Sequence, residues 1–275
     1  MAHVSNCLLA IFNLLSLLLS IPMVVAAAWA WRVSATHCGR FLQAPLVTLS
    51  VAVLVISAAG LLGAALRLTW LTWAYMAAMS AAIAGIMAAT ALALAVVREG
   101  RSGVEAIPGK AYVEFRAEGY SEWLRNRVFG HWDTMKRCLI QENICRSMAD
   151  DHAAMSAREF YSKPLNPLQS GCCKPPNECK FEYVSPTKWR ATDKSSTAKN
   201  NTINPDCGAW SNDDNILCYN CESCKGAMLF QLNLSLMKFG AVGIIILSYL
   251  IIVFAVGCCA LRNNRKQDEM KNGQR

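Results

Sequence analysis

Residues 171–176 read Gly-Cys-Cys-Lys-Pro-Pro, and this hexapeptide says more about the architecture of the chain than any other stretch. Adjacent cysteines do not readily pair with each other, so Cys172 and Cys173 each need a different, distant partner. Such crosslinks belong to exposed domains in oxidising compartments. The hexapeptide lies in a polar segment between the third and the fourth of four long apolar blocks. We therefore expect a disulfide-stabilised domain on a membrane anchor.

The four apolar blocks account for the high hydrophobic content of the 275-residue chain. Each block is free of charged side chains and exceeds the roughly 18 helical residues that cross about 30 Å of hydrocarbon. Because only a helix satisfies every backbone group of one such segment inside lipid, each block predicts a transmembrane helix. The predicted transmembrane helices are 7–31, 46–66, 71–97 and 238–261.

Basic residues in the short segments predict the orientation of these helices. The tail, residues 262–275, carries five of them, and an arginine lies in the turn 67–70. Both segments and residues 1–6 are therefore predicted to be cytosolic. The small loop, residues 32–45, and the large loop, residues 98–237, then lie outside the cell or in a lumen.

The first apolar block allows a second interpretation, a cleaved signal peptide, because it contains small residues at 26–28. The block is long for a signal core, and no basic residue precedes it. The large loop stays outside with either interpretation, because the other three helices determine its side.

The net charge of +8 does not indicate a nucleic-acid partner. Basic and acidic residues nearly balance in the large loop, and the surplus lies beside the membrane, where each Lys or Arg favours anionic lipid by about 1 kcal/mol. The apolar blocks hold no ionisable Asp, Glu, Lys, Arg or His, which argues against a pump or a transporter of charged substrates. The four histidines have no ligand spacing, and we find no catalytic constellation. No enzyme activity and no cofactor are predicted.

The large loop contains nine cysteines, an odd number. An oxidised domain rarely leaves one exposed thiol, and the cysteine of the small loop makes the number even. Five disulfides are therefore predicted, one of them between the two loops, with the pairing left open. Each disulfide contributes roughly 2–4 kcal/mol, chiefly by restricting the unfolded chain. The ten cysteines are Cys38, Cys138, Cys145, Cys172, Cys173, Cys179, Cys207, Cys218, Cys221 and Cys224.

Cys218, Cys221 and Cys224 repeat the C-x-x-C spacing, which can hold zinc or carry out thiol–disulfide exchange. An oxidising compartment favours structural disulfides instead. All three cysteines are also among the ten that are predicted to form five disulfides. A membrane thiol oxidoreductase is kept as an alternative function. A four-span channel or junction protein is another, although such junction proteins often carry their cysteines in the first outer loop.

The large loop is predicted to be mainly helical. Apolar residues at helical spacing favour helices over 112–129 and 132–148, and a further helix at 229–236 leads into the last transmembrane segment. Residues 187–204 are polar and form a predicted surface excursion. The predicted fold class is thus an all-α membrane protein, a four-transmembrane-helix bundle with a disulfide-rich, mainly helical large extracellular loop.

Two kinds of modification site are predicted. Cys7, Cys258 and Cys259 lie at the cytosolic edges of the first and last helices, where a reduced thiol is a candidate for S-palmitoylation. The alternative is a small apolar helix residue. N-glycosylation sequons begin at Asn200 and Asn233. Asn200 is the predicted acceptor, whereas Asn233 is so near the membrane that the glycosylating enzyme reaches it poorly.

Four residues are predicted to pack the helices together. Asn13 is the one amide inside an apolar block, where it seeks an interhelical hydrogen bond worth roughly 0.6–2 kcal/mol. Gly60, Gly63 and Gly85 lie on faces of small residues, which let helices approach closely.

Taken together, the pattern resembles the tetraspanin family, and specifically its plant type. The resemblance covers nearly the whole chain and rests on the hexapeptide 171–176, on Cys38, and on Leu-Cys-Tyr-Asn-Cys-Glu-Ser-Cys-Lys at 217–225. Animal members usually have Cys-Cys-Gly, whereas Lys174 follows the doublet here, as in the plant variant.

The resemblance implies a membrane organiser without catalysis. Such proteins bind each other and partner receptors laterally as homo- or hetero-oligomers, and they form microdomains in the plasma membrane or enter secreted vesicles. In that scheme the variable part of the large loop, here 179–217, selects partners, and the acylated edge cysteines hold a lipid-rich assembly. Similar members are associated with development, senescence and defence.

Overall fold

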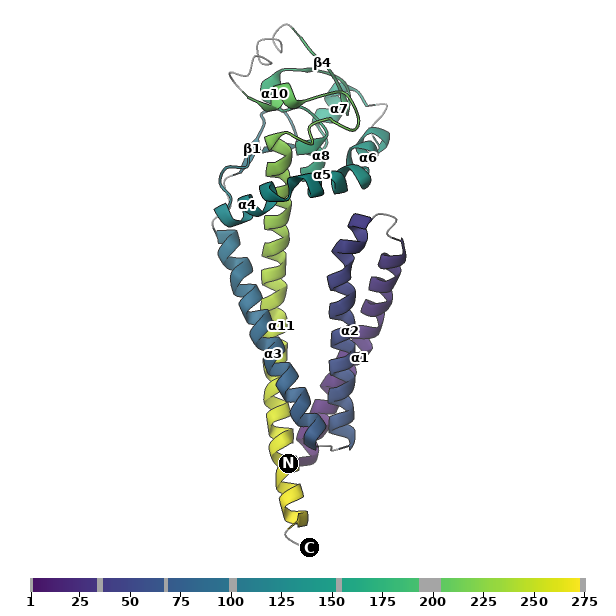
Figure 1. The fold of residues 1–275 in the computed structure, drawn as a ribbon, viewed down its shortest axis with the longest axis vertical. Coiled ribbons are helices and arrows are strands. Elements are labelled where there is room, and N and C mark those ends of the chain that lie inside the picture. The colour runs from purple at the N-terminus through teal and green to yellow at the C-terminus, as the bar shows by residue number, and fades with distance from the viewer. Residues whose placement is uncertain are drawn as a thin grey trace. The chain divides into compact units, whose positions relative to one another are not determined.

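The computed structural model describes residues 2–33, 37–66, 69–98, 103–151, 155–192 and 204–272. They form two compact units (Figure 1). We call Met1–Ala91 with Gly240–Arg275 the membrane unit and Leu92–Phe239 the head unit. Helices α3 and α11 contribute to both units.

Within the described residues, four helices are long and apolar enough to cross a membrane. They are α1 (Ala2–Val33), α2 (His37–Leu66), α3 (Thr69–Arg98) and α11 (Glu222–Asn272). The candidate spans within these helices are Cys7–Trp29, Val47–Leu66, Trp70–Arg98 and Glu222–Lys266. The predicted number of membrane helices agrees with the structure.

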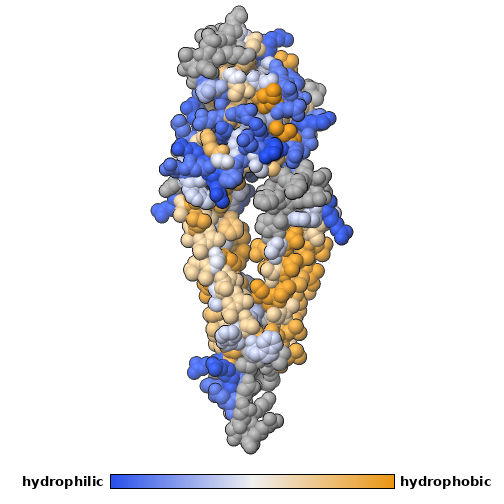
Figure 2. Space-filling view, viewed as in Figure 1, coloured by the Kyte–Doolittle hydropathy of each residue, from blue (hydrophilic) through white to orange (hydrophobic). Residues whose placement is uncertain are grey.

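The surface of the membrane unit is suited to lipid and not to water. Large hydrophobic side chains such as Leu19 and Ile245 are mostly exposed, and Figure 2 shows hydrophobic residues over most of this unit and hydrophilic ones over most of the head unit. Exposed tryptophans lie near helix ends, Trp29 in α1 and Trp70 and Trp73 in α3. Tryptophan prefers the interface between lipid and water, so these positions fit helices that span a bilayer.

The head unit combines short helices with two antiparallel hairpins. The strands are β1 (Val104–Ala106) paired with β2 (Val113–Phe115), and β3 (Glu182–Ser185) paired with β4 (Lys188–Arg190). The helices are α4 (Glu122–Gly130), α5 (Trp132–Gln141), α6 (Ile144–Asp151), α7 (Ala157–Tyr161), α8 (Pro167–Cys172), α10 (Asp206–Ala209) and the 3₁₀ turn η1 (Asn177–Cys179). The predicted fold class is confirmed, with the hairpins as an addition.

Two predicted helices of the large loop are shorter or broken, for local backbone reasons. Residues 112–129 do not form one helix, because Gly119 adopts φ 92 and α4 begins only after Ser121, whose side chain accepts a hydrogen bond from the Leu124 N–H. Residues 132–148 divide into α5 and α6 at Asn143, which has φ 52. Asparagine tolerates this left-handed conformation better than most residues.

The core of the head unit is aromatic and disulfide-rich. Phe160 is fully buried, and its ring stacks on Tyr183 with centroids 5.0 Å apart. Tyr183 in turn meets Trp189 of β4 edge to face at 5.4 Å. These rings hold the β3–β4 hairpin against α7, so the strands have a core although they are short.

Candidate functional site

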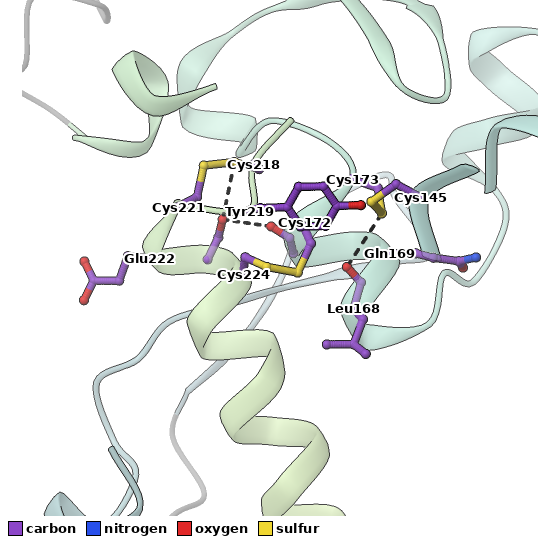
Figure 3. The surroundings of a disulfide bond; sticks show 12 residues. Cys145, Leu168, Gln169, Cys172, Cys173, Cys218, Tyr219, Cys221, Glu222 and Cys224 are labelled. Carbon is purple, nitrogen blue, oxygen red and sulfur yellow. Dashed lines mark hydrogen bonds between the residues drawn. A yellow bond between two sulfur atoms is a disulfide. The ribbon is translucent and has the colours of Figure 1, made fainter. Parts of the chain in front are cut away.

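The cysteine doublet lies at the C-terminal end of α8. This helix begins with a capping box between Asn166 and Gln169 and with a proline in its first turn, which suits a short helix. Cys172 is its last residue and pairs with Cys224 of α11, whereas Cys173 pairs with Cys145 of α6 (Figure 3). The two neighbours therefore have different partners and join α8 to two separate helices.

Close backbone contact accompanies these bridges. A Cβ added at Gly171 would lie 2.6 Å from both the Ala227 Cβ and the Ser223 carbonyl oxygen, so α8 can approach α11 only with glycine here. The Ser223 hydroxyl donates to the Gly171 carbonyl at 3.1 Å, and the Cys218 N–H donates to the Cys172 carbonyl at 3.1 Å. The hexapeptide is thus fastened to the start of α11 by covalent, steric and polar contacts.

Lys174, the residue after the doublet, is a buried cation. Its ammonium forms an ion pair with Glu114 of β2 at 2.8 Å and lies 4.5 Å from the centroid of the Tyr112 ring. The same Glu114 oxygen accepts the Asn177 N–H at 2.8 Å. Burial lowers the pKa of Lys174, and the neighbouring Glu114 carboxylate opposes that shift. A buried charge of this kind is tolerated only when it is paired.

The other described bridges span 28 residues and 3 residues. Cys179 pairs with Cys207 and Cys218 pairs with Cys221, while Cys138 is also disulfide-bonded. The side chain of Cys38 lies outside the described residues, so its bridge to the large loop stays a prediction.

The C-x-x-C repeat is fully used in bridges. Cys218, Cys221 and Cys224 are completely buried, and Cys224 is bound to Cys172. Thiol exchange needs an accessible, low-pKa thiolate. The described geometry therefore favours a structural role for these cysteines and not the alternative oxidoreductase.

Asp206 of α10 caps the long helix α11 from a distance in sequence. Its two carboxylate oxygens accept the N–H groups of Glu222 and Ser223 at 2.6 Å and 2.9 Å. The carboxylate is buried and satisfies donors that the first turn of any helix leaves free. Sequence reasoning missed this cap and the Lys174–Glu114 pair, because both partners come from different elements. The only local signal was the lysine in the hexapeptide.

The predicted packing residues of the membrane unit differ in their surroundings. A Cβ on Gly60 would overlap the Asn13 side-chain oxygen and lie 2.7 Å from the Tyr75 ring, so this glycine lets α1, α2 and α3 meet. Asn13 donates to the Leu9 carbonyl of its own helix at 2.9 Å. A Cβ on Gly63 would lie 3.2 Å from the Thr72 hydroxyl.

Gly85 has different surroundings, because nothing in the described residues lies within 4 Å of a Cβ added there. Its small face is not used for packing within these parts of the chain. Two glycines of α11 that sequence reasoning did not select are closely packed instead: Gly243 against Thr90 and Gly257 against Met76. The Tyr249 hydroxyl, also unpredicted, lies 2.8 Å from the Ser16 hydroxyl.

The predicted modification sites lie apart from the crosslinked core. Cys7, Cys258 and Cys259 are free and exposed on α1 and α11. Asn233 is half-buried within α11. Asn200 lies outside the described residues.

Comparisons with known proteins agree with this architecture. The model of the Tetraspanin family matches residues 5–263. The chain is 40% identical over 270 residues to Tetraspanin-8 of Arabidopsis thaliana, covering 98% of this chain and 96% of that protein. It is 40% identical to Tetraspanin-7, with 97% and 99% covered, and 36% identical to Protein TORNADO 2, with 96% and 95% covered, both from Arabidopsis thaliana. No solved structure matches. With four apolar helices and a crosslinked loop between the last two, the chain belongs to the tetraspanin family.

Proposed function

We propose that this multi-pass membrane protein is a non-catalytic scaffold that binds itself, other tetraspanins and membrane receptors laterally, and so builds microdomains in the plasma membrane. Segment 179–217 of the head unit selects the partners. One observation carries this proposal. The head unit is mainly hydrophilic, yet the described parts of segment 179–217 expose apolar side chains and are fixed by several contacts. Val184 and Ile216, both within 179–217, are about half exposed.

Several contacts fasten the described parts of that segment. The Cys179–Cys207 bridge joins two of its parts, and Asp206 ties it to α11. The side-chain amide of Asn212 exchanges two hydrogen bonds of 2.9 Å with the backbone of Trp189. A surface ordered before binding loses less entropy when a partner docks, which favours selective contacts.

A cavity beside segment 179–217 is lined by charged side chains to which a partner could bind. It has a volume of about 410 Å³ and is bordered by Arg146 and Asp150 of α6 and by Asp214. Both signs of charge are present, so a partner is recognised by the arrangement of its polar groups and not by net charge alone.

The membrane context of the proposal follows the distribution of charge and thiols. Arg262, Arg265 and Lys266 are exposed on α11 beyond its most apolar part, which supports a cytosolic C-terminus and contact with anionic lipid. We place the N-terminus on the same side, palmitoyl chains on Cys7, Cys258 and Cys259, and a glycan on Asn200. The family resemblance supports roles in development, senescence or defence.

Proximity labelling in intact cells tests the partner surface. The variant Val184→Lys/Ile216→Lys places two charges on segment 179–217 and is expected to remove specific protein neighbours while the protein still reaches the membrane. Val104→Lys is the matched control, because Val104 is an exposed apolar residue of β1 outside the segment. An unchanged set of neighbours for the double variant would contradict the proposed surface.

A further inference from the structure

Helix α4 of the head unit has one buried face and an exposed flank with an unusual composition. Leu124 and Val128 are buried, whereas Trp123 is 56% exposed. Trp123 is the most exposed large hydrophobic side chain among the described residues 103–238. Arg127, one helical turn further along, is also exposed. A single exposed hydrophobic side chain is normal on a protein surface, so the meaning of Trp123 depends on where α4 lies.

The core beneath α4 includes the end of a membrane helix. Leu124 belongs to the same buried cluster as Val96 of α3, and Leu236 of α11 packs against that cluster. Helix α3 has 30 residues, so its length of about 45 Å exceeds the roughly 30 Å of hydrocarbon, and its last turns reach the lipid headgroups. Figure 1 shows α4 beside this end of α3. Helix α4 therefore lies at the level where α3 leaves the bilayer.

The exposed flank of α4 and its Phe129 side chain lie on different sides of the helix. Phe129 faces the opposite way, because the Lys225 ammonium lies 4.8 Å from its ring centroid. Lys225 is in the first turn of α11, about 20 Å along the helix from Lys238, where the apolar block begins. Trp123 and Arg127 share the other flank of α4, since residues four apart lie on one side of a helix. That flank faces away from the start of α11, which is the end of this helix farthest from its apolar block.

The geometry points to α4 as a membrane-surface helix, with Trp123 inserted among the lipid headgroups and Arg127 bound to a lipid phosphate. Tryptophan favours the interfacial layer, and the arginine guanidinium matches a phosphate in shape and charge. Residues 123–132 contain no Asp or Glu, and the nearest acidic residues in the sequence are Glu122 and Asp133 on either side. This lipid contact goes beyond the lateral scaffold role, because it needs no protein partner.

Fluorescence quenching tests the contact on the full chain, with one copy in each lipid nanodisc. The signal of Trp123 is the difference between the wild type and Trp123→Phe. We expect phosphatidylcholine brominated on its acyl chains to quench most of this signal, and aqueous iodide to quench it several-fold less than an exposed tryptophan. The matched control is Trp123→Phe/Val184→Trp, because Val184 is 51% exposed on β3, which pairs with β4, and Figure 1 shows β4 and α4 at opposite ends of the head unit. Its added tryptophan should respond to iodide and not to brominated lipid.

Three results would overturn the inference. Trp123 could behave like the control, open to iodide and unaffected by brominated lipid. Trp123 could be protected from iodide in nanodiscs with several copies of the chain but not in those with one copy. That result would assign the flank to contact with a second copy of the chain. Finally, Arg127→Gln is expected to raise the quenching of Trp123 by acrylamide, an uncharged aqueous quencher, several-fold, and an unchanged value would remove the phosphate contact.

Discussion

The membrane unit and the head unit are each stabilised by a different kind of internal contact. In the membrane unit the described helices meet at glycines, as at Gly60 and Gly243, and its described cysteines are free. In the head unit every described cysteine is in a disulfide, and a lysine is buried in an ion pair.

This contrast follows from the solvent of each unit. Lipid tails are as apolar as the helices, so burial gives no hydrophobic driving force between helices and close steric fit decides their packing. A small head in water has a core too small to be stable by itself, and crosslinks compensate by restricting its unfolded chain. Variants that act on one unit alone therefore test whether the two units are stabilised independently.

The largest effect is expected from breaking the buried ion pair of the head unit. Glu114→Gln leaves the Lys174 ammonium buried without its counter-ion, which should destabilise the head by about 3–5 kcal/mol. Thermal unfolding followed by near-ultraviolet circular dichroism reports on the aromatic head core, while the far-ultraviolet signal of the membrane helices should change little. The control Glu114→Leu/Lys174→Met removes both charges and should recover most of the stability. A double variant no better than Glu114→Gln would contradict this account.

The disulfides should differ according to the length of chain that they close. Replacing Cys172 and Cys224 by serine opens a separation of 52 residues and should cost about 4 kcal/mol on the chain-entropy relation. The same change at Cys218 and Cys221, three residues apart, should cost about 2 kcal/mol. Denaturant unfolding of the head measures both values. Equal losses would show that local packing, and not chain restriction, determines the role of these bridges.

A steric test addresses the membrane unit. Gly60→Ala places a methyl group against Asn13 and Tyr75 and should destabilise the helix bundle by about 1–3 kcal/mol through overpacking. Gly85→Ala is the matched control, because the described residues leave its Cβ position open. Thermal unfolding in nanodiscs, followed by far-ultraviolet circular dichroism, should give a lower midpoint for Gly60→Ala than for Gly85→Ala. The near-ultraviolet signal of the head should unfold at the same temperature in both variants. Equal behaviour of both variants would argue against glycine contacts as the basis of this unit.

The smallest effect is expected from a polar contact between membrane helices. Tyr249→Phe removes a hydroxyl that lies 2.8 Å from the Ser16 hydroxyl and donates to the Phe12 carbonyl at 3.2 Å. The loss should be about 0.6 kcal/mol, typical of interhelical hydrogen bonds in membranes. Ser248→Ala serves for comparison, since that hydroxyl bonds only the Ile244 carbonyl of its own helix among the described contacts. If Ser248→Ala destabilised the bundle more, the interhelical contact would be unimportant.

The sequence predicted those features that depend on composition or counting. Four membrane helices follow from uncharged blocks, and separate partners for Cys172 and Cys173 follow from their adjacency. The pairing itself could not be predicted, because it depends on how α6, α8 and α11 are brought together. The same applies to Glu114 beside Lys174.

Local sequence patterns were also insufficient where the role of a residue depends on the elements that surround it in the fold. Gly60 and Gly85 lie in similar runs of small residues, yet only Gly60 has a neighbouring helix in the described structure. The helical spacing of residues 132–148 did not predict the left-handed conformation of Asn143, which divides this segment into two helices. Periodicity reports which residues share a face, but it does not report what that face meets.

The cap on α11 has a mechanical consequence. Asp206 holds the first turn of α11, whose 51 residues belong in part to the head unit and in part to the membrane unit. The segment that carries Asp206 is the one proposed to receive partners, and the far end of the helix bears Arg262 and the cysteines proposed for acylation. A pull on segment 179–217 therefore acts, through the Asp206 carboxylate, on the first turn of the same helix whose other end carries the basic residues.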